Sequence, residues 1–202
     1  MVKINSLIDG YKRFHKKFFI DDNKTYKELF ENGQSPKTLV ISCSDSRADP
    51  SIILDTDPGD IFVIRNIANL VPPYEEDDTT CHGTSAAIEY AVNYLKVENI
   101  IVLGHSQCGG IDAMVNETVD ENKNFSFIDK WVQIAKKAKE NAQLKTLGPD
   151  QNIACLCEKE AIKLSLANLE SFPFIKNKMK KNEISLHGWY FSLEDGSIEI
   201  IN

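Results

Sequence analysis

An uninterrupted apolar run at residues 99–105, NIIVLGH, limits what this chain can fold into more than any other feature. Runs of this kind are typical of strands in a parallel sheet, which is covered on both faces and so tolerates few polar positions. Two further segments, KTLVISC at 37–43 and DIFVIRN at 60–66, have a similar character. The three runs predict neighbouring buried strands.

Helical patterns alternate with these runs, and this order predicts an α/β fold with a mostly parallel central sheet. The chain finishes with EISLHGWYFSL, a Glu-Asp-Gly turn and SIEII, which together predict a hairpin. We expect the helices that flank the sheet at residues 83–97, 108–116, 127–141 and 150–170.

The first 35 residues predict an N-terminal helical arm. One helix ends near Ile20, and a second runs from Thr25 to about Asn32, where Gly33 serves as the C-cap. The length of 202 residues favours one domain over two, so we expect a single domain over 1–202 with the arm at 1–35.

The composition is that of an ordinary globular protein, with 42% hydrophobic residues, 26% charged residues and a net charge of −7. An acidic balance argues against nucleic acid or an anionic membrane as a partner. The basic segment YKRFHKK at 11–17 reads as the solvated face of a helix, because apolar residues recur at helical spacing from Ile4 to Phe18.

No apolar stretch is long enough to cross a bilayer, and the N-terminus has no secretory signal pattern. Five cysteines form an odd set with irregular spacing, which is unlike a secreted disulfide scaffold. We therefore expect a reducing compartment, the cytoplasm.

Chemically active side chains follow the ends of two predicted strands. Cys43 closes the first strand and leads into CSDSR, with Asp45 and Arg47, whereas His105 closes the third strand and leads into HSQCGG, with Cys108. The carboxyl ends of parallel strands meet at one edge of a sheet, where ligands collect. Two thiolates and one imidazole are a known ligand set for catalytic zinc. A Cys–His nucleophile pair, and cysteines that are only buried apolar residues, remain as alternatives.

CSDSR and HSQC, in this order and at these strand ends, resemble the motifs of the β-class carbonic anhydrases, in particular their plant-like branch. The similarity runs from about residue 25 to the end of the chain. Further segments resemble the family in family order: GQSPKTLVISCSDSR, PGDIFVIRNIANLVPPY, GTSAAIEYAV, LGHSQCGG, CEKEAIKLSLANL and LHGWYF.

The resemblance implies reversible hydration of carbon dioxide to bicarbonate and a proton by a zinc-bound hydroxide. It implies one Zn²⁺ per chain, with Cys43, His105 and Cys108 as its ligands. Asp45 and Arg47 would form a catalytic pair beside the metal, in which Arg47 holds the carboxylate and Asp45 accepts a hydrogen bond from the hydroxide.

The resemblance also implies a small substrate pocket, to which Gln34 contributes a hydrogen bond and Gly109 a backbone N–H. The positions that match its apolar lining are Phe62, Ile67 and Tyr90. In relatives, part of this pocket comes from a second subunit, so a homodimer or a multiple of it is implied. Without the resemblance, these three apolar residues would be read as ordinary core.

Two other functions remain as alternatives. Related enzymes act on carbon disulfide or carbonyl sulfide with the same ligand set, so the sequence separates these substrates poorly. A zinc-dependent binding or regulatory protein would be expected to lose Asp45, Arg47 or Gln34, and this chain has all three.

Overall fold

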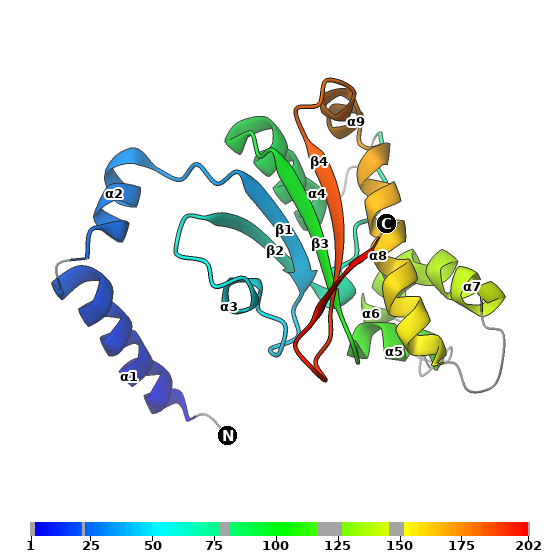
Figure 1. Ribbon diagram of the computed structural model, residues 1–202, viewed down its shortest axis with the longest axis horizontal. Helices are drawn as coiled ribbons and strands as arrows, with labels where there is room; N and C mark the ends of the chain where they lie inside the picture. The colour runs from blue at the N-terminus through cyan, green and yellow to red at the C-terminus, as the bar shows by residue number, and fades with distance from the viewer. Residues whose placement is uncertain (1–2, 22, 77–80, 117–126, 146–151, 202) are drawn as a thin grey trace.

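A computed structural model describes residues 3–21, 23–76, 81–116, 127–145 and 152–201 of the protein. Its centre is a five-stranded sheet in the order β2-β1-β3-β4-β5, in which β5 alone runs antiparallel to its neighbour (Figure 1). The strands are Thr38–Cys43 (β1), Ile61–Asn66 (β2), Asn99–His105 (β3), Ser185–Phe191 (β4) and Ile198–Ile201 (β5). The α/β fold with a mostly parallel sheet and a C-terminal hairpin is therefore confirmed.

Helices connect these strands near the expected positions. They are α3 (Pro50–Ile53), α4 (Gly83–Glu89) with its π-helical continuation η3 (Tyr90–Leu95), α5 (Gly109–Val115), α6 (Phe127–Val132), the 3₁₀ turn η4 (Gln133–Ala135), α7 (Lys136–Lys145), α8 (Ile153–Ser171) and α9 (Pro173–Lys180). The sequence analysis missed α3 and α9. Both begin at a proline that follows a residue with extended backbone, which suits the first position of a helix. Among the described helices, none has the length and apolar character needed to cross a bilayer.

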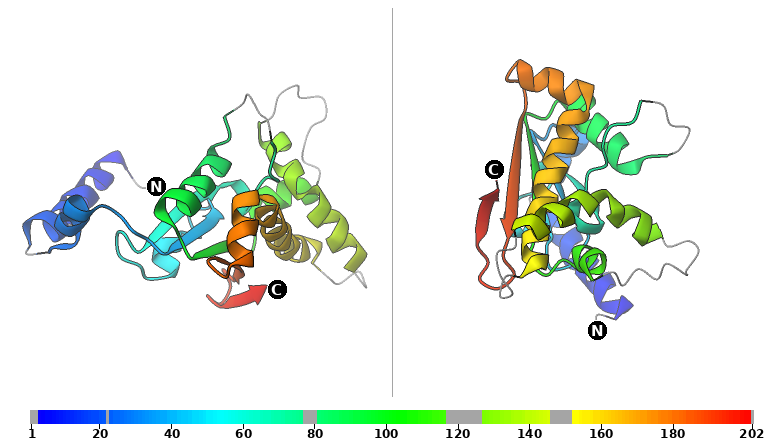
Figure 2. Two further views of the ribbon diagram at one scale, coloured as in Figure 1. Left: turned by 90° about the horizontal axis from the view of Figure 1, so that it is seen from above. Right: turned by 90° about the vertical axis from the view of Figure 1, so that its right-hand side faces the viewer.

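The two faces of the sheet are covered differently (Figure 2). On one face, α4, α8 and α9 bury the alternate side chains of β1 and β3 in the main core, which includes Leu39, Ile41, Ile88, Ile162 and Ile175. The other face buries a smaller cluster of Val40, Ile101 and Leu103 against Ile53, Leu54, Ile61, Trp189 and Phe191. Because each fully buried side chain of this kind stabilises the fold by about 1.5–3 kcal/mol, the strand ends are firmly held.

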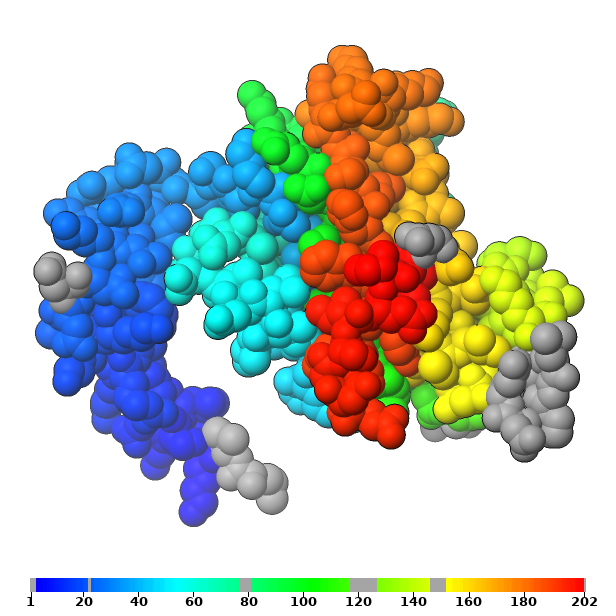
Figure 3. Space-filling model, viewed as in Figure 1, coloured from blue at the N-terminus to red at the C-terminus, as the bar shows by residue number. Residues whose placement is uncertain are grey.

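The N-terminal arm consists of α1 (Ile4–His15), the π-helical turn η1 (Lys16–Ile20) and α2 (Thr25–Asn32). It stands beside the sheet and its helices instead of packing over them (Figures 1 and 3). Ring contacts of Tyr26 with Phe14 and Phe18, at centroid distances of 5.4 and 5.3 Å, hold α2 against the preceding helix. Gly33, with φ of 75°, ends α2 as expected.

Much of the apolar face of α1 is exposed in the single chain. Exposed fractions of the side chains range from 50% to 71% for Ile4, Leu7, Ile8 and Tyr11. An apolar surface of this kind is typical of an interface with another protein molecule.

Candidate metal centre

Cys43, His105 and Cys108 meet at the carboxyl edge of the sheet. Cys43 ends β1, His105 ends the neighbouring strand β3, and Cys108 is the residue that precedes α5. All three are buried, and their ligand atoms lie within 4.8 Å of one another. The structure thus brings together the three residues that the sequence placed at this edge.

The sulfur atoms of the two cysteines lie 3.9 Å apart. Cys43 Sγ also accepts a hydrogen bond from the backbone N–H of Asp45 at 3.4 Å. The hydrogen bond that Cys108 donates lowers the pKa of Cys43 to about 4. The same bond, together with burial, raises the pKa of Cys108. One thiolate is therefore stable here, and a second requires a cation between the two sulfurs.

The imidazole of His105 is oriented for a metal ion. Its Nδ1 lies 2.8 Å from the carbonyl oxygen of Ser106, so Nδ1 carries the hydrogen and donates it. Its Nε2 is buried, and no described residue offers that atom a hydrogen bond. An unpaired buried polar atom costs about 1–3 kcal/mol, a cost that a metal ligand avoids. Two thiolates and this nitrogen are a donor set that fits zinc.

Asp45 and Arg47 form a bidentate ion pair next to the three ligands. Arg47 Nε donates to Asp45 Oδ1 at 3.0 Å, and Arg47 Nη2 donates to Oδ2 at 2.7 Å. These bonds, with a third from the Arg47 backbone N–H to Oδ1, hold the pKa of Asp45 well below its usual range. Arg47 Nη2 also donates to the carbonyl of Gln107 at 3.1 Å, which ties the loop after Cys43 to the loop before Cys108.

Arg65 supports the same loop and was missed by the sequence analysis. From β2 it donates to the carbonyl oxygens of Cys43 at 3.0 Å and Asp45 at 2.7 Å, and it pairs with the carboxylate of Asp49 at 2.6 Å. In DIFVIRN it is an isolated cation in an apolar strand, which is the one signal that could have selected it.

Glu158, in α8, was also missed. It is 5% exposed; its Oε1 accepts the backbone N–H of Cys108 at 2.9 Å, and its Oε2 accepts the hydroxyl of Tyr190 at 2.7 Å. Burial raises the pKa of Glu158, although both hydrogen bonds favour its charged form. This carboxylate fixes the backbone at Cys108 from behind.

Two of the predicted pocket residues lie at this edge. Ile67 directly follows β2, and its side chain lies so close to Gly110 that a Cβ there would stand 2.6 Å from Ile67 Cγ2. Gly109 is exposed, and a Cβ there would meet no atom within 4 Å. Both are therefore placed beside the three candidate ligands, with open space over Gly109.

The other three lie elsewhere in the chain. The rings of Phe62 and Tyr90 are in contact, with centroids 5.9 Å apart. Phe62 pairs in register with Leu39, four residues before Cys43, which corresponds to roughly 13 Å along the strand. Gln34 is exposed and precedes β1. One chain therefore does not bring these three residues to the metal centre.

Known proteins share this fold. The family model described as carbonic anhydrase matches residues 38–198. The structure of the β-carbonic anhydrase CcaA is 31% identical with a TM-score of 0.84, and the match covers 98% of this chain and 86% of that one. The chain belongs to the β-carbonic anhydrase family. A structure from a report on two tetrameric β-carbonic anhydrases of Sordaria macrospora is 30% identical with a TM-score of 0.75, covering 98% of this chain and 93% of that one.

Two β-carbonic anhydrases of Arabidopsis thaliana are also similar, number 5 from the chloroplast at 46% identity and number 6 from the mitochondrion at 40%. The matches cover 92% and 94% of this chain but only 60% and 64% of the relatives' lengths. The cytoplasmic location expected from the sequence is wrong by this comparison, because these relatives point to an organelle. A set of unpaired cysteines argues against the secretory route only, and so cannot separate the cytoplasm from an organelle.

Proposed function

We propose that this β-carbonic anhydrase catalyses the reversible hydration of carbon dioxide to bicarbonate and a proton, with one Zn²⁺ per chain held by Cys43, His105 and Cys108. One observation carries the proposal: a buried, unpaired His105 Nε2 lies beside two sulfurs that cannot both be anions without a cation. Zinc bound there would act as a Lewis acid that lowers the pKa of water.

In this proposal, Asp45 orients the attacking water. Arg47 donates twice to Oδ1 and once to Oδ2, which leaves acceptor capacity on Oδ2. Because its pKa is low, Asp45 stays ionised and acts only as an acceptor. A water molecule that donates its hydrogen to Oδ2 has a lone pair directed away from the carboxylate, and the carbon of the substrate would lie on that side.

The substrate would be held by groups from two chains. In the first chain, Ile67 forms an apolar wall and the backbone N–H of Gly109 donates to a substrate oxygen. A second copy supplies Gln34, Phe62 and Tyr90, so the functional unit is a homodimer or a multiple of it. The 44% exposure of Tyr90, the open apolar face of α1 and the tetrameric Sordaria relatives support this part of the proposal.

Metal analysis combined with a stopped-flow hydration assay tests the proposal. We expect one zinc per chain and rapid hydration, both lost after chelation and restored by added zinc. Protein with stoichiometric zinc but no hydration would refute the activity, and protein that purifies and reconstitutes without zinc would refute the metal site. Incubation with carbon disulfide or carbonyl sulfide should release no sulfide, since the relatives reported above are carbonic anhydrases and give no support to those substrates.

A further inference from the structure

A strained turn joins β2 to the metal centre. In this turn, Ile67–Asn69 (η2), both Ala68 and Asn69 have left-handed backbone, with φ of 64° and 48°. That region is uncommon for alanine because its Cβ crowds the backbone. Both residues are buried, at 0% and 3% exposure. Such a conformation persists only where the surrounding structure holds it in place.

The turn forms one wall of the metal centre. Ala68 is fully buried in the same apolar cluster as Cys43 and Cys108. On the other side, a Cβ on Gly110 would lie 2.6 Å from the side chain of Ile67 and 3.1 Å from that of Ala68, so the turn packs closely against α5. The conformation of this turn therefore sets both the packing of Ala68 beside two candidate ligands and the position of the pocket wall.

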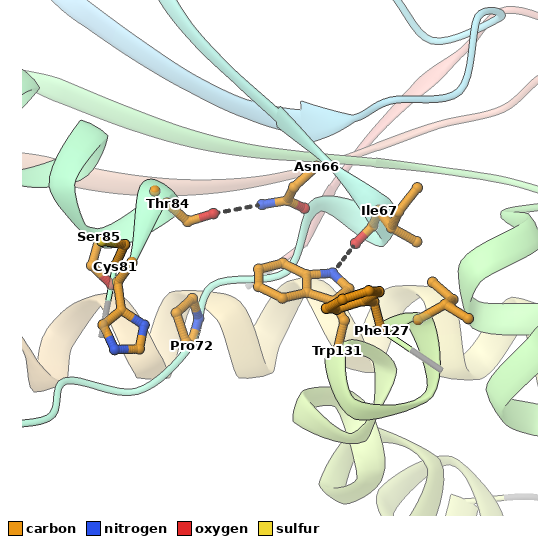
Figure 4. A pocket seen from close by; sticks show the side chains of 11 residues that line it. Asn66, Ile67, Pro72, Cys81, Thr84, Ser85, Phe127 and Trp131 are labelled. Atoms are coloured by element: carbon orange, nitrogen blue, oxygen red, sulfur yellow. Dashed lines mark hydrogen bonds between the residues drawn. The ribbon is translucent and has the colours of Figure 1, made fainter. Parts of the chain in front are cut away.

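Two side chains hold the turn. Asn66 closes its ends, because Oδ1 accepts the N–H of Leu70 at 3.0 Å and Nδ2 donates to the carbonyl of Leu70 at 2.9 Å. Trp131, from α6, donates its indole N–H to the carbonyl oxygen of Ile67 at 2.7 Å (Figure 4). The indole thus acts on the peptide group that joins Ile67 to Ala68, a residue that is buried in one cluster with Cys43.

The indole of Trp131 is itself fixed between the core and a cavity. It packs against the buried cluster that contains Cys43, Ala68 and Cys108. It also lines, with Ile67 and Asn66, a cavity of about 670 Å³ (Figure 4). Packing therefore sets the position of the indole, and its N–H donates to the carbonyl of Ile67.

We propose that Trp131 is a positioning residue of the metal centre: its indole N–H holds the carbonyl of Ile67, fixes the Ile67–Asn69 turn and so keeps Ala68 packed in the buried cluster with Cys43 and Cys108. The inference deepens the proposed function, because it rests on Cys43 being a metal ligand. Loss of the hydrogen bond from the indole should lower the affinity of the site for the metal and move the side chain of Ile67 out of its position in the pocket wall.

Trp131→Phe keeps an aromatic ring and removes only the donor. With Co²⁺ as a spectroscopic probe in the full chain, we expect the sulfur-to-cobalt charge-transfer bands to shift. Release of the metal to a chelator should become roughly tenfold faster, the lower end of the range for groups that support metal ligands. Trp189→Phe is the matched control, since Trp189 packs against the other face of the sheet. A wild-type spectrum and release rate in Trp131→Phe would overturn the proposal.

A double variant tests whether the effect passes through the turn. Glycine adopts a positive φ without strain, so Ala68→Gly added to Trp131→Phe should restore part of the slow metal release. Fast release that stays unchanged in the double variant would overturn the assigned route.

The wild-type protein provides a test that does not depend on any variant folding. Its two tryptophans give two indole N–H resonances, which Trp189→Phe assigns. Addition of metal should shift the Trp131 resonance and leave that of Trp189 in place, and an unmoved Trp131 resonance would overturn the proposal.

None of these readouts uses hydration. Wild-type protein that binds Co²⁺ but does not hydrate carbon dioxide would refute the proposed activity alone, whereas protein that binds neither Co²⁺ nor Zn²⁺ would refute both.

Discussion

The two edges of the sheet differ in how much of a site each one completes. At the carboxyl edge, the three candidate ligands are buried and their ligand atoms lie within 4.8 Å of one another. At the amino edge, Gln34 is exposed, Phe62 is half-buried and Tyr90 is 44% exposed, although the same site is expected to use them.

Physical chemistry explains this difference. Ionisable groups that are buried must find their partners inside the fold, because an unpaired buried charge is very costly. Partial exposure of an aromatic ring costs little free energy, so such a ring can remain uncovered until a second molecule binds. The three candidate ligands therefore meet within one chain, whereas the pocket in our proposal would take its amino-edge residues from another copy.

The largest effect is expected at the carboxyl edge. His105→Ala removes one of the three proposed ligands, so zinc should be lost and hydration should fall to the uncatalysed rate. His187→Ala is the matched control, because His187 in β4 bonds to Ser185 at 3.0 Å and lies outside the cluster. Elemental analysis that finds full zinc in His105→Ala would contradict the ligand assignment.

A smaller loss of hydration activity is expected when the three candidate ligands are kept and the carboxylate of Asp45 loses its ion-pair partner. Arg47→Ala removes all the side-chain bonds that orient Asp45, and hydration should fall by about 10- to 100-fold while zinc remains bound. Arg13→Ala, on the exposed face of α1, should leave both quantities unchanged. Stopped-flow hydration rates and zinc content should be measured on the same samples. A fully active Arg47→Ala enzyme would exclude the role of Arg47 in orienting Asp45.

The smallest effect is expected at the amino edge. If Gln34 donates the proposed hydrogen bond to the substrate, Gln34→Ala should lower kcat/KM by about tenfold, which corresponds to roughly 1.4 kcal/mol. Zinc content should not change, because Gln34 lies away from the metal in its own chain. Gln143→Ala, at an exposed position of α7, is the control. Equal kcat/KM values for the two variants would show that Gln34 does not contact the substrate.

The sequence alone predicted the carboxyl edge well, because Cys43 and His105 directly follow apolar runs and parallel strand ends converge. It missed Arg65 and Glu158, which bond to backbone groups 22 and 50 residues away. Hydrogen bonds between such distant positions leave no periodic pattern, so each residue reads as an ordinary polar position.

Other features were hidden for different reasons. Trp131 has the pattern of an apolar helix residue, although its indole N–H donates to a carbonyl oxygen 64 residues away. The end of α8 was predicted to within one residue, but α9 was missed because only Phe172 separates the two helices. The amino-edge residues were selected only through the family resemblance, and no pattern in one chain shows where a second chain lies.

In the proposed dimer, each site combines the carboxyl edge of one chain with the amino edge of another. Cys108→Ala damages the first edge, and Phe62→Ala with Tyr90→Ala damages the second. A mixed dimer of these two chains would hold one site with both edges damaged and one site with both edges intact.

Purified mixed dimers, isolated with two different affinity tags, give the most direct measurement. The claim predicts that hydration activity returns to about half of the wild-type value per dimer, although each parent variant alone is poorly active. Mixed dimers that are no more active than the average of their two parents would contradict it, because a site built within one chain cannot be repaired by its neighbour.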